Sequence, residues 1–183
     1  MFVEWVVYPF LGVGLAFATY AAAALLHEGG HALFGCLFRA RCLWIRVGGL
    51  LWVPGGGIFV RVKRGITPGE CAILCPDQKS CVMAALGGSV MNFGTGVVAG
   101  VAWLFRGYSL WDVHPLFFAG LVAFLLCSFG MVVLNLCPGG TGMENDGMIM
   151  KRLGREERFY ERLRRNQQRD LIRVEFGGVE EMF

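Results

Sequence analysis

The chain has 183 residues, of which 55% are hydrophobic and 17% charged, and its formal net charge is +3. The length suits one domain, and the apolar fraction exceeds that of ordinary soluble domains. The small net charge, without a basic stripe interleaved with aromatic residues, argues against nucleic-acid binding. Long uncharged runs alternate with short basic segments, which is typical of a multi-pass integral membrane protein embedded in the lipid bilayer.

The first uncharged run covers residues 5–26 and is followed at once by His27 and Glu28. As a helix, the run is long enough to cross a hydrocarbon core of about 30 Å. No basic region precedes it and no small-residue cleavage site follows it. The sequence therefore predicts a permanent membrane span rather than a removed signal peptide.

The segment after this span has a different composition. Residues 44–47 and 58–63 have the character of strands, and the second run alternates apolar and basic side chains after Val60. Glycines and Pro54 separate these runs as turns. The sequence predicts a small β-hairpin or sheet near the membrane surface, which is either a connector or an exposed edge that pairs with an extended peptide.

Seven cysteines, an odd number without the spacing of a disulfide framework, predict mostly reduced thiols. Cys71, Cys75 and Cys81 lie close together in the chain and offer soft metal ligands. They lack the usual C-x-x-C spacing, so we expect ordinary loop residues rather than a second metal site.

Two further uncharged runs, residues 82–105 and 116–138, are also long enough to span a membrane as helices. The first of them contains Gly96 and Gly100 in a G-x-x-x-G pattern. Small residues at this spacing predict close packing against a neighbouring helix.

The composition changes after Gly147, because residues 151–173 mix arginine and glutamate with widely spaced apolar side chains. This pattern predicts a charged helix outside the membrane. The expected fold is an α-helical membrane protein with a core of three transmembrane helices, a small β-hairpin or sheet between helices one and two, and a charged C-terminal helix. Residues 1–150 form the membrane-embedded core, and residues 151–183 form a cytosolic charged helical tail.

The basic residues predict the orientation of the spans. Only Glu4 precedes the first span, and only Arg106 is a basic residue between the second and third spans. Most other basic residues near the spans follow the first and the third of them, among them Arg39, Arg41, Arg46, Arg61, Lys63, Arg64, Lys151, Arg152, Arg155 and Arg158. We therefore expect the N-terminus outside and the C-terminus in the cytosol.

His27-Glu28-Gly29-Gly30-His31 matches the pattern H-E-x-x-H. Residues four apart share one face of a helix, so both imidazoles can reach one tetrahedral Zn²⁺. Glu28 lies beside them and is suited to take a proton from an attacking water. A charged side chain in a membrane helix costs about 3 kcal/mol, so two unligated core histidines with a buried acid are the weaker interpretation.

A catalytic zinc takes a third protein ligand and keeps its fourth position open. His114 and Asp112 lie on the opposite side of the membrane in the expected topology. Glu144 and Asp146 follow the third span on the same side as His27. Both offer the hard oxygen donor that zinc accepts, so the residues alone leave these two acids as alternatives.

With these motifs the chain resembles the site-2 protease family of intramembrane metallopeptidases over roughly residues 5–150. His27 to His31 matches the first family motif, at the end of the first span. Asn135-x-x-Pro138 followed by Asp146-Gly147 looks like the second motif, although the stretch between Pro138 and Asp146 is longer than in the family pattern.

A third likeness lies in the middle span, where residues 88–92 look like the family's G-P-x-x-N with Ser89 in place of proline. In this resemblance Asn92 either gives a hydrogen bond to the substrate or its oxyanion, or packs the middle helix. The resemblance implies cleavage of membrane-spanning or membrane-anchored proteins or peptides within or near a bacterial-type cell membrane, with loop strands that help to hold the substrate. A regulatory membrane partner or an oligomer would control access.

The resemblance also implies the roles of the site residues. Glu28 is the catalytic base. Asp146 is favoured over Glu144 because it precedes Gly147, as in the family's Asp-Gly. The implied zinc ligands are His27, His31 and Asp146.

The main alternative is a non-catalytic zinc-binding membrane scaffold of the same fold, although such a protein would not need Glu28. A zinc transporter would need ionisable groups spread along its spans, whereas here they gather at one end.

Overall fold

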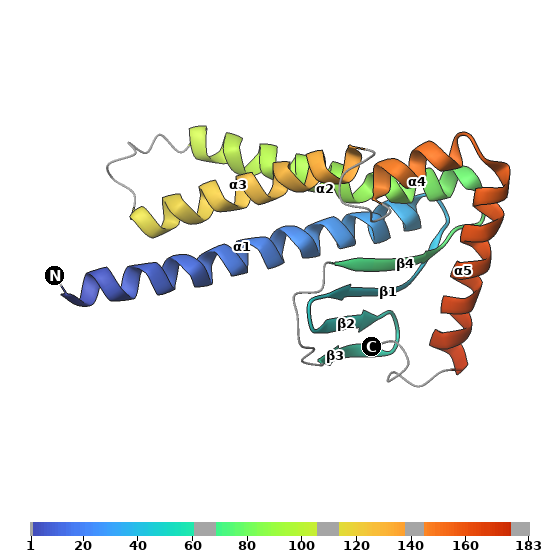
Figure 1. Cartoon of the computed structure of the whole chain (residues 1–183), viewed down its shortest axis with the longest axis horizontal. Coiled ribbons are helices and arrows are strands. Elements are labelled where there is room, and N and C mark those ends of the chain that lie inside the picture. The colour runs from blue at the N-terminus through green and yellow to red at the C-terminus, as the bar shows by residue number, and fades with distance from the viewer. Residues whose placement is uncertain (1, 61–68, 106–113, 138–144, 177–183) are drawn as a thin grey trace.

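The computed structural model describes residues 2–60, 69–105, 114–137 and 145–176. Three long helices run side by side along the long axis of the molecule (Figure 1). They are α1 (Phe2–Leu37), α2 (Gln78–Phe105) and α3 (Pro115–Leu136). Each is long and apolar enough to cross a membrane. The three expected helical runs are confirmed, and their length and composition indicate a membrane protein.

Helix α1 continues well past the end of its uncharged run, so the motif from His27 to His31 lies inside the helix. The helix ends at Leu37 and is followed by a left-handed residue, Arg39, whose φ is 65°. The N–H of Ala40 donates to the carbonyl of Gly35 at 2.8 Å, and that of Arg39 donates to Cys36 at 3.1 Å. These bonds form a Schellman cap, which turns the chain directly into the first strand.

A four-stranded antiparallel sheet lies beside the C-terminal half of α1, with the order β3-β2-β1-β4 (Figure 1). Its strands are β1 (Arg41–Val47), β2 (Leu50–Val53), β3 (Gly57–Val60) and β4 (Glu70–Leu74). A tight turn joins β1 to β2 at Gly48, whose φ of 59° is easily reached only by glycine. The expected small sheet is confirmed. Residues 61–63 of the expected second run lie outside the described residues.

The helices α1 and α2 approach most closely beside the histidine motif. A Cβ at Gly30 would collide with the carbonyl oxygen of Gly87, and a Cβ at Gly87 would collide with that of Gly30. Of the expected G-x-x-x-G pair, Gly96 packs on α3, where a Cβ would lie 3.1 Å from the ring of Phe129, while Gly100 faces open space. The closest contact between the helices therefore lies beside the histidine motif rather than at the expected G-x-x-x-G pair.

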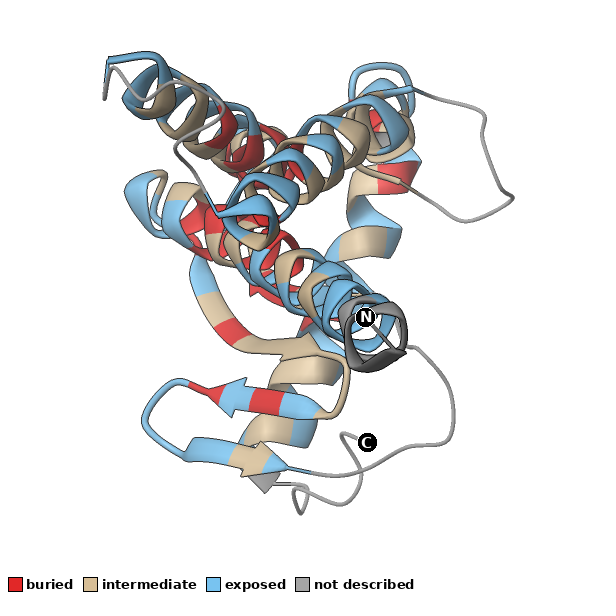
Figure 2. Ribbon diagram, turned by 90° about the vertical axis from the view of Figure 1, so that its left-hand side faces the viewer, coloured by how far each residue is buried: buried red, intermediate tan, exposed pale blue. Residues whose placement is uncertain are grey.

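Buried residues gather where α1, α2 and the sheet face one another, while the outer sides of the long helices are exposed (Figure 2). Those outer sides are apolar, with Phe10, Val98, Leu104 and Leu126 among their exposed residues. Large exposed apolar surfaces are unusual on soluble monomers and suit contact with lipid.

The charged C-terminal segment forms two helices, α4 (Asp146–Leu153) and α5 (Glu157–Phe176). The single helix expected over residues 151–173 is thus broken after Leu153. The break occurs because Gly154 caps α4, with its N–H donating to the carbonyl of Met150 at 3.1 Å. Helix α5 then crosses the end of the bundle (Figure 1).

Apolar side chains hold this charged segment against the rest of the molecule. Leu153 and Phe159 are buried in one cluster with Ile73 of β4 and Ala84 of α2. Burial of a large apolar side chain contributes about 1.5–3 kcal/mol. The segment is therefore packed over one end of the helices and the adjoining end of β4.

Candidate metal centre

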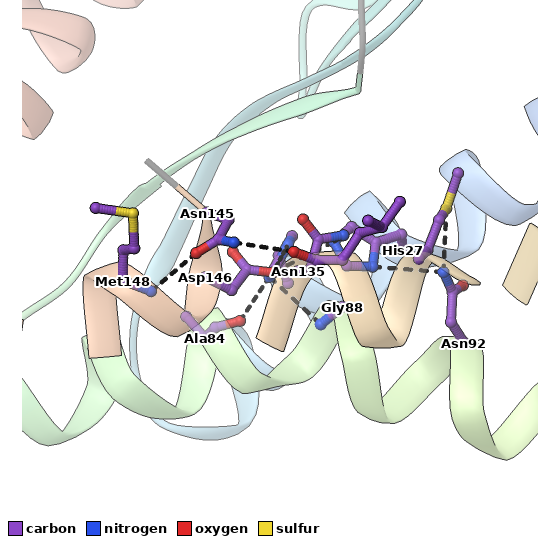
Figure 3. A network of polar contacts seen from close by, with 11 residues as sticks. His27, Ala84, Gly88, Asn92, Asn135, Asn145, Asp146 and Met148 are labelled. Atoms are coloured by element: carbon purple, nitrogen blue, oxygen red, sulfur yellow. Dashed lines mark hydrogen bonds and ion pairs between the residues drawn. The ribbon is translucent and has the colours of Figure 1, made fainter. Parts of the chain in front are cut away.

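Two imidazoles of α1 face the same side of the helix. His27 and His31 are about one turn apart, and their ring centroids are separated by 4.7 Å. Their Nε2 atoms lie 3.3 Å and 3.5 Å from Oδ2 of Asp146, the first residue of α4. The structure thus brings together the three residues expected as ligands (Figure 3).

The spacing of these three atoms fits a small cation. Ligand atoms about 2.0–2.1 Å from a tetrahedral zinc are about 3.3 Å apart, close to the distances found here. Oδ2 of Asp146 is buried and has no hydrogen-bond partner among the described residues. A buried polar atom without a partner is costly, and a bound cation would remove that cost.

Asp146 is held in place through its neighbours. The preceding residue, Asn145, caps α4 by accepting a hydrogen bond from Met148 N–H at 2.9 Å. Its Nδ2 donates to the carbonyls of Leu134 and Cys137 at the end of α3, at 2.9 Å and 2.8 Å. The start of α4 is therefore fastened to the end of α3 (Figure 3).

Gly147 makes this close approach possible. A Cβ at Gly147 would collide with the carbonyl oxygen of Leu136, so no other residue fits there without movement of the backbone. The glycine of the Asp-Gly pair thus lets the first turn of α4 lie against α3. This is the physical reason for a glycine directly after Asp146.

The backbone of α2 orients His31. Its Nδ1 lies 2.8 Å from the carbonyl oxygen of Ala84, and a donated hydrogen bond there leaves the Nε2 lone pair free for a metal. Gly88 leaves room for both rings, since a Cβ at Gly88 would lie 2.6 Å from Nε2 of His31 and 2.7 Å from Cε1 of His27. The glycine expected from the middle-span pattern is thus required by the imidazoles.

Asn92 lies behind His27 and is fully buried. Its Nδ2 lies 3.4 Å from Nδ1 of His27, and its Oδ1 has no partner among the described residues. The two ends of a primary amide have nearly the same shape, so a half-turn places Oδ1 where it accepts from His27 Nδ1–H. Asn92 does not line the cavity described below, which favours the packing alternative over contact with a substrate.

Glu28 lies next to the histidines and is 6% exposed. The ligand atoms of Glu28, His27 and His31 are all within 4.8 Å of one another and form a group that could hold a metal ion. The backbone of Gly69, just before β4, passes directly over the carboxylate. A Cβ there would lie 2.5 Å from Oε1 of Glu28.

A cavity of about 560 Å³ opens onto these residues. One wall is β4 with the preceding Gly69, and another is α5. The residues that α5 contributes are Leu163, Asn166, Gln167, Asp170 and Arg173. Asn135 at the end of α3 also lines the cavity, and its Nδ2 lies 3.2 Å from Nε2 of His27.

The other candidate ligands lie elsewhere. His114 caps the N-terminus of α3, where its Nδ1 accepts from Leu116 N–H at 3.3 Å, whereas the metal group lies beside the C-terminal end of that helix. Asp112, Glu144 and Pro138 lie outside the described residues.

Sequence reasoning missed several residues that shape the site. Asn145 was detectable, because an Asn directly before a helix is a common N-cap. Gly69 and the inner face of α5 gave no local signal, because they reach the site only through contacts between distant parts of the chain.

Comparisons with known proteins give no match: no family model, no curated protein and no solved structure matches this chain.

Proposed function

We propose that this protein is an intramembrane zinc endopeptidase of the site-2 protease type, which cleaves peptide bonds of membrane-spanning or membrane-anchored substrates. The observation that carries the proposal is the meeting of His27, His31 and Asp146 beside Glu28, at the end of apolar helices. Two imidazoles and one carboxylate are a ligand set found in catalytic zinc sites.

The residues of the chain take distinct roles in this proposal. Zinc, when bound, would act as a Lewis acid toward the scissile carbonyl and the attacking water. Glu28 would take a proton from the water and return it to the leaving amine. His31 and Asp146 are held by Ala84 and Asn145, so the site needs little rearrangement to receive a cation.

The cavity supports a peptide substrate. β4 is an edge strand that pairs only with β1 among the described strands, and its residues line the cavity. An extended peptide can hydrogen bond along such an edge, which would present its backbone to the site. A substrate helix would therefore unwind at the end of its span before it reaches Glu28.

The scaffold alternative also has an observation in its favour. The backbone of Gly69 lies against the carboxylate of Glu28, so in this arrangement the acid is covered. A protein that used the metal only to hold its helices together would keep such a cover permanently. An enzyme must displace it when the substrate binds.

Purified wild-type protein and Glu28→Gln should separate these alternatives. The variant keeps size and polarity but has no basic carboxylate, so it should retain zinc while cleavage falls by about 10²–10⁴-fold. Glu70→Gln is a matched control, because Glu70 lines the same cavity but is more exposed and pairs with Arg46.

Membrane proteomes of cells with wild-type protein and with Glu28→Gln should differ by an accumulated precursor in the variant. That precursor would supply the substrate for the purified assay. Equal cleavage by both proteins would remove Glu28 from the mechanism. Bound zinc with no precursor and no cleavage in either protein would favour the scaffold.

A further inference from the structure

Two thiols lie side by side in the wall of the cavity. Cys75 follows β4, and Cys81 lies in the first turns of α2. Both side chains are buried, with 4% of each exposed, and both line the cavity. Their sulfurs are neighbours, because both contact the same side-chain nitrogen of Gln167.

A side chain of α5 closes this cluster. Gln167 accepts a hydrogen bond from the backbone N–H of Cys75 at 3.1 Å through its Oε1. Its Nε2 lies 3.6 Å from Sγ of Cys75 and 3.7 Å from Sγ of Cys81. One amide thus contacts both sulfurs, and three elements meet at this point: the end of β4, the start of α2, and α5.

The arrangement differs from that of a buried cysteine that only fills space. Such a cysteine packs as a small apolar group and needs no polar partner. Here the hydrogen bond to Cys81, together with burial, raises the pKa of Cys75. Cys75 therefore keeps its proton, and we assign the first attack on an oxidant to Cys81.

We infer that Cys75 and Cys81 form a reversible disulfide that joins the end of β4 to the start of α2 and lowers the activity of the adjoining site. The oxidant is a low-molecular-weight disulfide such as glutathione disulfide. Cys81 thiolate attacks one of its sulfurs and releases one small thiolate. Cys75 loses its proton and attacks the mixed disulfide at Cys81, releasing the second. Two protein thiols are oxidised, and one small disulfide is reduced to two thiols.

Both thiols line the cavity, which is the side from which the oxidant reaches them, and their small exposed fractions mean that this wall must open for the attack. The bond would cross-link two walls of the cavity, because β4 and α2 both border it. A substrate that displaces Gly69 from Glu28 must move the backbone directly before β4. Fixing the other end of β4 to α2 opposes that movement, so the oxidised protein should turn over more slowly. This effect on turnover rests on the proposed function, whereas the disulfide itself does not.

The test uses the full-length protein in detergent micelles, equilibrated with reduced and oxidised glutathione and then alkylated and digested. Mass spectrometry should find a peptide pair linked through Cys75 and Cys81 that disappears on reduction. The linkage should be absent in Cys81→Ser and in Cys81→Ala, and should persist in Cys36→Ser, which changes an exposed thiol. Oxidation should lower cleavage several-fold in wild type and Cys36→Ser, reversibly and without loss of zinc, but not in Cys81→Ala.

Absence of the Cys75–Cys81 linkage under conditions that oxidise the exposed thiols would overturn the inference. A linkage that leaves cleavage unchanged would overturn the inference that the disulfide lowers the activity of the adjoining site. If the reduced wild type cleaves nothing, the proposed function fails, and the mapped linkage still decides whether the disulfide forms.

Discussion

At the scale of single residues, the site consists of donors that are each fixed by a neighbour. Ala84 holds the ring of His31, Asn92 lies against His27, and Asn145 places Asp146. Such outer contacts set the tautomer and direction of a ligand, and their loss typically lowers metal affinity by about 10–100-fold.

The third ligand can be tested by replacing each of the two acids that the sequence offered. Asp146→Ala should lose most of its zinc and its useful cleavage, because Oδ2 of Asp146 is the atom that faces both imidazoles. Glu144→Ala is the matched control and should keep its metal. Zinc content and cleavage would be measured on the same purified samples. The reverse pattern would identify Glu144 as the third ligand. Normal zinc content in both variants would exclude both acids as zinc ligands.

Asn92 should act on the metal through His27. Asn92→Ala should lower zinc affinity by about 10–100-fold, since a freed imidazole can adopt the wrong tautomer or direction. Ser128→Ala is a suitable control, because Ser128 is also fully buried in a long helix and lies outside the metal group. Zinc titration of both variants against a competing chelator gives the comparison. Equal zinc affinities of Asn92→Ala and Ser128→Ala would mean that Asn92 only packs the helices.

At the scale of elements, the sheet and α4 bring backbone close to the side chains that do the chemistry. Gly69, directly before β4, covers Glu28, and the first turn of α4 lies against α3. Both approaches depend on a missing Cβ, at Gly69 and at Gly147. Glycine at these positions is a requirement of packing rather than of turn geometry.

A side chain at Gly69 should interfere with the base and leave the metal in place. Gly69→Ala places a Cβ within 2.5–2.9 Å of the Glu28 carboxyl group, so the carboxylate must move. A displacement of about 1 Å in a reacting group can cost roughly 10²-fold in rate. Gly94→Ala is the control, because a Cβ there meets nothing within 4 Å. Unchanged cleavage in Gly69→Ala would mean that residue 69 moves away from Glu28 before catalysis.

The sequence was sufficient for the parts of the fold that depend on local pattern. Uncharged runs located the three long helices, and the spacing of His27 and His31 placed both rings on one face. Three other features depend on distant contacts, and local pattern could not locate them. The strand at Glu70–Leu74 exists through its pairing with β1, and α5 reaches the cavity through bonds such as Gln167 to Cys75. The closest helix crossing likewise falls at Gly30 and Gly87, where two backbones meet.

At the scale of the whole molecule, the polar site and the elements around it are concentrated at one end. The metal group, the sheet, α4 and α5 all lie toward the end where α1 stops and α2 begins, while the N-terminus lies at the opposite end (Figure 1). The middle of the helices presents apolar surface. A peptide bond near one face of the membrane would therefore meet both the site and the water that hydrolysis consumes.

The last prediction is the side of the membrane on which this end lies. Described basic residues such as Arg39, Arg41 and Lys151 lie at the end that holds the site, and basic residues near spans remain in the cytosol. We expect the N-terminus outside and the C-terminus inside. Reporters that are active on only one side of the membrane, fused at Met1 and at Phe183, should report opposite locations.

A reporter inserted between α2 and α3 is the internal control and should agree with the one at Met1, since three spans place these points on the same side. A cytosolic N-terminus would contradict the expectation and move the metal group to the outer face. It would also place Cys75 and Cys81 in an oxidising compartment, where disulfides persist instead of forming transiently. The topology therefore decides whether the thiol pair can respond to changes in cytosolic redox state.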